Sequence, residues 1–341
     1  MANGQRRPGA RPTLEAVAAR AGVGRGTVSR VINGSPKVSE RARDAVLRAI
    51  EELGYVPNRA ARTLVTKRTD TVALVVSESE QRVFDEPYFA GVIRGIGSAL
   101  AETGLQLILA MAQTQDEHAR LEQYLTGQHV DGVMLISLHG ADPLPGRLEE
   151  MGVPTVVGGR PVGITPHSYV DVDNRAGARQ AVKYLLGKGR RRIATIAGPQ
   201  DMGVGVDRLA GYRDALIATG VPECVAYGDF SEESGAAAMR ELLEKDPDID
   251  AVFTASDPMA MGAMHVLKAS GRRIPDDVAV IGFDDSRPSR LYIDPPLTTV
   301  HQPTEEMGRQ MAHLLVARIN GEPLEQPVVI LDTHLVIRGS A

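Results

Sequence analysis

The sequence predicts an α/β core of two lobes, each built on a doubly wound parallel sheet, preceded by a small all-α domain with a helix-turn-helix. Three observations predict this fold class. Residues 13–33 hold two short helical patterns with a tight turn between them. From residue 71 onward, near-continuous apolar strands alternate with helices, which is typical of parallel sheets covered on both faces. The 341 residues exceed what one core usually holds, so two or three domains are expected.

The first helix of the small domain has both a start and a stop signal. The Thr13 hydroxyl can accept a hydrogen bond from an amide of the first turn, and Gly22 can adopt the left-handed conformation that ends a helix. Its apolar face consists of Leu14, Val17, Ala18 and Ala21.

A second helix is predicted from about Arg25 to Val31. Its apolar side holds Val28, Val31 and Ile32, and its outer side holds Arg25, Gly26, Thr27, Ser29 and Arg30. A short helix with a small, polar and basic outer face, following a tight turn, has the geometry that enters a DNA major groove. For this segment alone, an ordinary helical hairpin is the alternative.

A third helix is predicted from Ser39, its N-cap, to Gly54, which ends it. Its core stripe is Ala42, Val46, Ala49, Ile50 and Leu53. Three helices this short form a marginal domain, which favours stabilisation by partners.

The charge of the chain is divided between its parts. Residues 1–68 hold 14 Lys and Arg against 5 Asp and Glu, a net charge of +9. The remainder holds 24 against 38, a net charge of -14, and the two together give the -5 of the whole chain. A basic N-terminal part on an acidic body indicates an anionic partner for the N-terminal part alone.

Residues 57–69 are expected to form a hinge. Pro57 separates the segment from the third helix, and Asn58 can cap a helical turn. The stretch from Arg59 to Val65 is too short to be a stable helix alone. It is therefore either a plain linker or a helix that folds only when it is docked.

In the body, strands are expected at 71–77, 105–112, 130–137 and 153–159, and a second cycle follows residues 169–173 with strands at 192–199, 249–256 and 278–285. The restart of the cycle predicts two sheets, hence two lobes with a cleft. Two closing strands are expected near the C-terminus, after a late helix at 305–321.

Several classes of protein are disfavoured by the sequence. The polar N-terminus has no apolar segment of a secretory signal, and no run approaches the length of a membrane span. The single Cys224 fits a reducing cytoplasm. No Cys and His spacing suggests a metal site, and no cofactor is expected. His118, His139, His167 and His265 are scattered and are expected at the surface.

The motifs together resemble a known family. The N-terminal stretches TLEAVAARAGVGRGTVSRVIN and VSERARDAVLRAIEELGYVPNRAAR closely resemble the DNA-binding domain of lactose-repressor-type (LacI/GalR) regulators. The body carries GPQDMGVGVDRLAGYRDAL, VFTASDPMAMGAM, VIGFDD and PPLTTVHQP, which look like motifs of that family's core. The resemblance spans nearly the whole chain. It implies a homodimer or tetramer, a periplasmic-binding-protein-like core with a small effector in its cleft, and regulated binding to palindromic double-stranded operator DNA.

The resemblance also implies domain boundaries. The expected domains are a headpiece at 1–56, a hinge at 57–69, an N-terminal lobe at 70–172 and 300–326, and a C-terminal lobe at 173–299 and 327–341.

In this family the first two residues of the recognition helix and the Arg near its end read bases. Here these residues are Arg25, Gly26 and Arg30. Arg can bind guanine O6 and N7 with two hydrogen bonds, whereas Gly26 can read nothing, so a G-containing half-site is favoured. A phosphate contact is the alternative for Arg25. The remaining short donors suited to phosphate contacts are Thr13, Thr27, Ser29 and Asn33.

One residue of the headpiece, Gly24, departs from the family's pattern, and one residue of the hinge, Leu64, matches it. Gly24 stands where the family commonly has Ser, and glycine is a weaker but acceptable helix cap. Leu64 matches the hinge leucine that the family inserts into the minor groove, where apolar wedges unstack a base step. Asn58 and Arg59 would contact the DNA backbone beside it.

The resemblance implies an effector pocket that supplies charged planar groups for sugar hydroxyls and an aromatic face for C–H groups. Arg208 and Asp284 match the family's cleft arginine and carboxylate, and Phe230 stands where some sugar-binding members place an aromatic residue. Ser256 stands where other members of the family have an Asn. Asp257, the next residue, could cap the following helix. Arg160 and Gln302 are further candidates. The alternatives are an ion pair between lobes for Arg208 and Asp284, and a plain core position for Phe230.

The sequence favours a sugar-relieved repressor over other functions. A periplasmic transport receptor would share the core but would need a signal peptide and no basic head. An enzyme is disfavoured because no G-x-G-x-x-G follows Ser77 and no P-loop or G-x-S-x-G is present. A purine-responsive corepressor-type regulator is the alternative within the family. The expected localisation is the cytoplasm.

Overall fold

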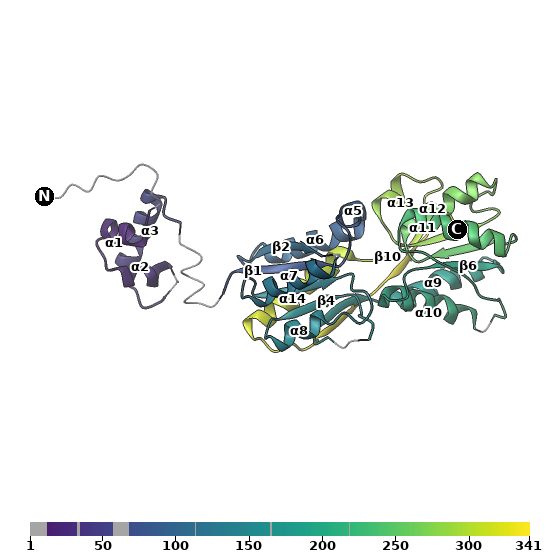
Figure 1. The fold of residues 1–341 in the computed structure, drawn as a ribbon. Coiled ribbons are helices and arrows are strands. Elements are labelled where there is room, and N and C mark those ends of the chain that lie inside the picture. Colours follow the sequence, from purple (N-terminus) through teal and green to yellow (C-terminus); the bar gives the residue numbers. More distant parts are fainter. Residues whose placement is uncertain (1–11, 33–34, 57–67, 113, 164–165, 218) are drawn as a thin grey trace. The chain divides into compact units, whose positions relative to one another are not determined.

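The computed structural model describes residues 12–32, 35–56, 68–112, 114–163, 166–217 and 219–341. The chain forms two compact units, Met1–Thr69 and Asp70–Ala341 (Figure 1). Among the described helices, none is long and apolar enough to cross a membrane. Asn33, Asn58, Arg59 and Leu64, which the resemblance places at the DNA, lie outside the described residues.

The N-terminal unit contains the three predicted helices, α1 (Leu14–Ala21), α2 (Arg25–Ile32) and α3 (Glu40–Leu53). Thr13 and Ser39 cap α1 and α3, accepting hydrogen bonds of 3.3 and 3.4 Å from backbone amides. Gly22, with a φ of 67°, ends α1 in the left-handed conformation, as predicted. Apolar side chains from all three helices close a small core: Val17, Ala18, Val28, Val31, Val46, Ala49 and Tyr55.

The first lobe of the C-terminal unit is built on a six-stranded sheet whose neighbouring strands are all parallel. The strands, in the order in which they lie, are β11 (Val328–Leu331), β5 (Tyr169–Val172), β4 (Thr155–Gly158), β3 (Gly132–Ile136), β1 (Thr71–Val76) and β2 (Gln106–Met111). One face is covered by α6 (Pro87–Leu100) and α14 (Thr304–Asn320), and the other by α7 (Gln115–Thr126) and α8 (Leu144–Glu150).

The second lobe has the same arrangement. Its strands lie in the order β12 (His334–Val336), β10 (Thr298–His301), β9 (Ala279–Asp284), β8 (Ala251–Thr254), β6 (Ile193–Ala197) and β7 (Cys224–Tyr227), and only β12 is antiparallel to its neighbour. One face is covered by α9 (Asn174–Gly187) and α10 (Gly203–Leu216), and the other by α11 (Glu232–Lys245) and α12 (Asp257–Ala269).

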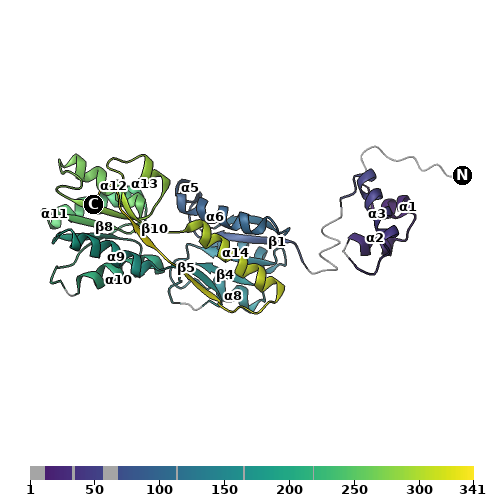
Figure 2. The same ribbon diagram turned by 180° about the vertical axis from the view of Figure 1, so that it is seen from behind.

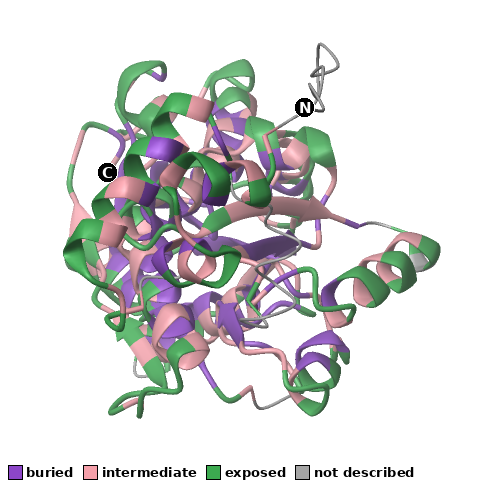
Figure 3. Ribbon diagram, turned by 90° about the vertical axis from the view of Figure 1, so that its left-hand side faces the viewer, coloured by how far each residue is buried: buried purple, intermediate pink, exposed green. Residues whose placement is uncertain are grey.

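The strands are apolar throughout because both faces of each sheet are covered. On β1, Val72, Leu74 and Val76 pack under α6 and α14, while Ala73 and Val75 pack under α7 and α8. The sheets are accordingly buried between helices whose outward sides are exposed (Figure 3). This arrangement explains why period-2 alternation is absent from the sequence of the core strands.

The chain passes between the two lobes after β5, after β10 and after β11, and Figure 2 shows β10 leading from the second lobe toward α14 of the first. These passages correct the expected lobe boundaries. β10 belongs to the second sheet up to His301, and Val328–Leu331 pairs with β5 in the first sheet. The first lobe therefore includes about 302–331 rather than 300–326, and only residues from about 332 onward return to the second lobe.

The structure adds short elements that the sequence patterns missed. These are α5 (Glu80–Asp85), α8, α13 (Arg287–Leu291), β7 and β10. Each has between four and seven residues, which is too few to establish a helical or strand period.

Candidate functional site

A cavity of about 110 Å³ lies between the two lobes of the C-terminal unit. Residues that follow β3, β4, β9 and β10 contribute to its walls, so the carboxyl ends of both sheets face it, as open α/β sheets arrange their ligand sites. The structure brings together all six residues predicted for the effector pocket, since the cavity is lined by Arg160, Arg208, Phe230, Ser256, Asp284 and Gln302.

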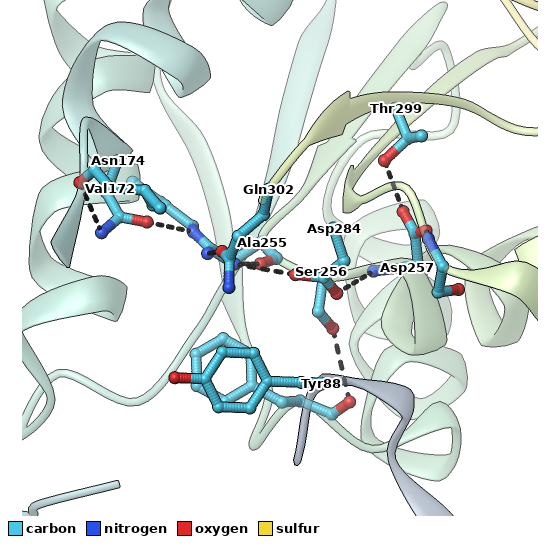
Figure 4. Close-up of polar contacts among 12 residues, drawn as sticks. Tyr88, Val172, Asn174, Ala255, Ser256, Asp257, Asp284, Thr299 and Gln302 are labelled. Carbon is cyan, nitrogen blue, oxygen red and sulfur yellow. Dashed lines mark hydrogen bonds and ion pairs between the residues drawn. The ribbon is translucent and has the colours of Figure 1, made fainter. Parts of the chain in front are cut away.

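Arg208, on α10, is the centre of the polar network in this cavity. Its Nε donates to Asn174 Oδ1 at 2.9 Å, and its Nη2 donates to Gln302 Oε1 at 2.6 Å (Figure 4). Its Nη1 donates to the carbonyl oxygen of Ala255 at 2.5 Å. The guanidinium carbon lies 3.6 Å from the centroid of the Phe283 ring, within stacking distance. Burial lowers the pKa of Arg208, an effect that the nearby Asp284 opposes.

Asp284 stands at the carboxyl end of β9 in a strained backbone. Its φ is 125° and that of Asp285 is 60°, both in the region that favours glycine. Its Oδ2 accepts a hydrogen bond of 3.2 Å from the Asp257 amide, and its Oδ1 lies 3.7 Å from Arg208 Nη1. Burial raises the pKa of Asp284. Arg208 and Asp284 both belong to the second lobe, so their ion pair does not join the lobes.

Asp257 supports this turn rather than capping α12. Its carboxylate accepts hydrogen bonds from the hydroxyls of Thr299 and Ser289, both at 2.5 Å, and from the Ser286 amide at 2.7 Å. The N-cap is Ser256, whose Oγ accepts from the Met259 amide. The expectation that Asp257 caps the helix was therefore wrong, because the preceding hydroxyl already fills that position.

Asp171, on β5, is a buried carboxylate that the sequence analysis did not single out. It accepts hydrogen bonds of 2.8 Å from the Arg160 and Val172 amides and one of 3.0 Å from Asn174 Nδ2. Burial raises the pKa of Asp171 to about 6. Asn174 thus joins Asp171 of the first lobe to Arg208 of the second.

Three aromatic residues line the cavity: Tyr88 and Phe89 from the first lobe and Phe230 from the second. Phe230 has a φ of 76°, and its ring fills the space beside Gly198, where a Cβ would meet it at 2.4 Å. It also packs in the core of the second lobe, so it is both a core residue and part of the cavity wall. Tyr88, at the start of α6, lies apart from the Arg208 network (Figure 4).

The other two arginines of the cavity bind carboxylates of the protein. Arg160 donates to both carboxylate oxygens of Asp207 on α10, at 2.9 and 2.8 Å, and this ion pair joins the lobes. Arg82, on α5, donates to Glu86 at 2.6 Å and to Glu78 at 3.0 Å. Its guanidinium carbon lies 5.7 Å from the centroid of Phe230.

His139, expected as a scattered surface residue, also connects the lobes. Its Nδ1 lies 2.9 Å from Asp201 of the second lobe, and its Nε2 lies 3.2 Å from Glu78 of the first. Hydrogen bonding to Glu78, together with Asp201, raises the pKa of His139 to about 8 against the opposing effect of burial.

In the N-terminal unit, α2 presents the predicted outer face. Arg25, Gly26 and Arg30 are exposed, Thr27 and Ser29 are half-buried, and Thr13 is exposed at the start of α1. Arg25 Nη1 lies 3.2 Å from Glu15 Oε1 on α1. Among the described residues, no group of three or more His, Cys, Asp or Glu side chains is placed to hold a metal ion.

Comparison with known proteins decides the family. The model of bacterial regulatory proteins, lacI family, matches residues 13–58, and that of the periplasmic binding protein-like domain matches residues 182–341. The HTH-type transcriptional regulator CelR of Thermobifida fusca is 62% identical over 335 residues, covering 97% of this chain and 98% of that relative. The chain belongs to the LacI family.

Solved structures agree with this LacI-family assignment. The transcriptional regulator CelR–cellobiose complex is 60% identical, with a TM-score of 0.78, and the match covers 97% of this chain and all 100% of that one. The Lac repressor dimer bound to operator and an anti-inducer is 28% identical, with a TM-score of 0.84 and coverage of 96% and 98%. This LacI-family chain is a DNA-binding transcriptional regulator.

The lining residues that sequence reasoning missed include Arg82, Glu86, Tyr88, Asp171 and Asn174. Asp171 had a usable signal, because it lies in YVDVD, the segment after which the strand–helix cycle restarts, near the carboxyl end of what proves to be β5. Arg82 and Glu86 had none, because the short α5 that carries them to the cavity was not predicted.

Proposed function

We propose that this LacI-family regulator is a repressor that leaves its operator when a small neutral sugar, a mono- or disaccharide, binds in the interlobe cleft. The observation that carries the proposal is the pairing of the cleft's arginines. Arg82, Arg160 and Arg208 all donate to acceptors of the protein itself. Arg82 and Arg160 are paired with carboxylates, whereas Arg208 donates to neutral acceptors and lies 3.7 Å from Asp284. A phosphorylated ligand would therefore have to displace hydrogen bonds that these arginines already make.

The same cavity offers acceptors for sugar hydroxyls. Asp171 and Asp284 are carboxylates with lone pairs beyond those used by their protein donors, and a carboxylate can accept several hydrogen bonds. Phe230 and Tyr88 supply apolar ring faces for the C–H groups of a sugar ring. The CelR relative, whose structure is that of a cellobiose complex, makes a β-linked disaccharide the first candidate.

A purine-responsive corepressor is the alternative within the family. The HTH-type transcriptional repressor PurR of Salmonella paratyphi B is 36% identical over 336 residues, covering 96% of each chain. The identity to CelR is much higher, at 62%, and this favours the sugar.

Isothermal titration of the full-length protein tests the effector class. We expect cellobiose to bind and its 6-phosphate to bind at least about tenfold more weakly, because the phosphate must be buried beside carboxylates. Asp284→Asn should weaken cellobiose binding. Its matched control is Asp246→Asn, which removes the charge of a half-buried carboxylate that is paired with Arg192 in the same lobe, away from the cavity. Tighter binding of hypoxanthine than of any neutral sugar would favour the purine alternative.

For the DNA we propose contacts by Thr13, Arg25, Thr27, Ser29, Arg30, Asn33, Asn58, Arg59 and Leu64, with Gly26 allowing close approach. Arg25 and Arg30 would read guanine, because their side chains are exposed on α2. We further propose that the protein acts as a homodimer in the cytoplasm, where two headpieces bind a palindromic operator, and that it binds its effector without transforming it.

A further inference from the structure

Arg25 has few side-chain neighbours on the recognition helix. It lies between Gly24 and Gly26, and a Cβ placed on either glycine would meet no atom within 4 Å. The Arg25 side chain itself is 74% exposed. A long side chain flanked by two glycines has many rotamers open to it, so it loses much conformational entropy when it is fixed on a base.

Glu15, the second residue of α1, contacts this arginine. Its Oε1 lies 3.2 Å from Arg25 Nη1. Hydrogen bonds from its own backbone amide and from Thr13 lower the pKa of Glu15, and the charge of Arg25 lowers it further, so Glu15 is ionised at neutral pH. The contact joins the two helices of the helix-turn-helix.

The carboxylate of Glu15 weakens the electrostatic attraction of the N-terminal part to DNA phosphates. The first 68 residues carry a net charge of +9, and a carboxylate beside the outer face of α2 opposes their attraction to DNA. Glu15 also stabilises the N-terminus of α1 as an acidic residue of its first turn, but that role does not require the contact with Arg25, and an exposed ion pair itself adds little to stability. A guanidinium has further N–H donors, and those not used by Glu15 remain available for guanine O6 and N7.

We propose that Glu15 is a positioning residue for base recognition, which holds the Arg25 guanidinium in the orientation that reads guanine. The proposal rests on the proposed contact of Arg25 with a base. Glu15 is then a determinant of sequence preference at one base pair of each half-site, and it acts through Arg25 rather than by touching the DNA.

The test uses the full-length protein and a panel of duplexes. The unmodified protein first selects its sequence from a random duplex library, and every single-base-pair variant of the selected duplex is then ranked by competition binding. Arg25→Ala identifies the base pair that Arg25 reads. Glu15→Gln should lower the preference at that same base pair by about three- to tenfold, a fraction of the discrimination of a bidentate contact. It should leave the base pair read by Arg30 unchanged.

Three further variants make the result specific. Glu15→Asp keeps the charge at the start of α1 but is one methylene shorter, so it should lower the same preference even if Glu15→Gln unfolds the headpiece. Glu15→Gln combined with Arg25→Ala should lose no more preference than Arg25→Ala alone. Glu52→Gln, which removes the exposed Arg20–Glu52 ion pair of the same headpiece, should change no position.

The failures of this inference and of the proposed function are distinguishable. A protein that selects no sequence would contradict sequence-specific binding itself, and the positioning role with it. A protein that selects a sequence, but whose preferences are the same with Gln or Asp at position 15, would overturn only the role of Glu15. A uniform change in affinity for all duplexes would also overturn it, because Glu15 would then act through net charge alone.

Discussion

Asp207 of the second lobe accepts two hydrogen bonds, of 2.9 and 2.8 Å, from the guanidinium of Arg160 in the first lobe. Near this pair, a Cβ placed on Gly203 would lie 1.9 Å from the Arg160 carbonyl oxygen. His139 of the first lobe adds a contact of 2.9 Å to Asp201 of the second. These contacts require the lobes to be in close approach, so the structure represents the closed arrangement of the cleft.

Gly203→Ala is expected to prevent this closure. The added methyl group would overlap the Arg160 backbone, which cannot move aside as a flexible side chain can. We expect effector affinity measured by titration calorimetry to fall at least about tenfold, or about 1.4 kcal/mol. The melting temperature of the core should change little. Gly187→Ala is the matched control, because a Cβ at that exposed end of α9 meets nothing within 4 Å. Equal affinity of both variants would show that closure is not needed for binding.

Effector affinity should depend on pH through His139. Its pKa is raised to about 8 in the closed arrangement, chiefly by Glu78 and Asp201, which come from different lobes. Glu78 belongs to the same lobe as His139, and only Asp201 belongs to the other. The part of the rise in pKa that Asp201 contributes requires contact between the lobes, and through this part protonation favours closure. This contribution is therefore complete below the ordinary pKa of His, about 6.5, and is lost as the pH rises through about 8. We expect His139→Gln to remove this part of the affinity profile between pH 6 and 9. The control is His265→Gln. His265 forms an exposed pair with Glu232, and its substitution should leave the pH dependence of effector affinity unchanged.

Arg208→Ala should destabilise the core strongly. Removing the buried guanidinium leaves the acceptors of Asn174, Gln302 and Ala255 without their donor. We expect a loss of about 3–5 kcal/mol in the free energy of unfolding, as when one partner of a buried ion pair is removed. Urea unfolding of the full-length protein measures it. Arg192→Ala removes the exposed guanidinium that pairs with Asp246 and should cost far less, because an ion pair at the surface adds little to stability. Similar losses in the two variants would contradict the network.

Operator affinity should fall steeply with salt, because the basic headpiece releases counterions when it neutralises phosphates. The core unit, residues 70–341, lacks the basic segment and should not hold the operator. Tight binding of that fragment, measured by fluorescence anisotropy at several salt concentrations, would contradict the assignment of DNA binding to the headpiece.

Arg30→Ala should cost more on the selected operator than on random duplex DNA. The difference should be about 1–3 kcal/mol if Arg30 binds guanine with two hydrogen bonds. Competition binding measures both affinities, and an equal loss on both would assign Arg30 to a phosphate instead.

The elements that the sequence predicted well are those with strong local signals. Thr13, Gly22, Ser39 and Gly54 mark helix ends, and the structure places all four in their predicted roles. The two-lobed core followed from apolar strands that repeat in two cycles. Local signals could not give the pairing partners of the last strands. β11 and β12 are separated by two residues but lie in different sheets, and only tertiary packing decides that.

The effector pocket, like the fold, could be predicted from the sequence only in part. All six predicted residues line one cavity, because strand ends and family motifs located them. Their partners could not be predicted, since Arg208 binds Asn174 and Gln302 from distant parts of the chain. The alternative interpretation of Arg208 and Asp284, an ion pair between lobes, does not hold because both residues belong to the second lobe. The pair that joins the lobes is formed by Arg160 and Asp207.

The central claim is that a neutral sugar releases the repressor from its operator, and one titration tests it most directly. The selected duplex, labelled with a fluorophore, is saturated with the full-length protein, and cellobiose is added while anisotropy is recorded. The account predicts that the anisotropy falls to that of free DNA for the unmodified protein, and that Asp284→Asn needs a much higher sugar concentration. Undiminished operator affinity at saturating cellobiose and at saturating concentrations of other neutral mono- and disaccharides, or affinity that rises with the sugar, would contradict it.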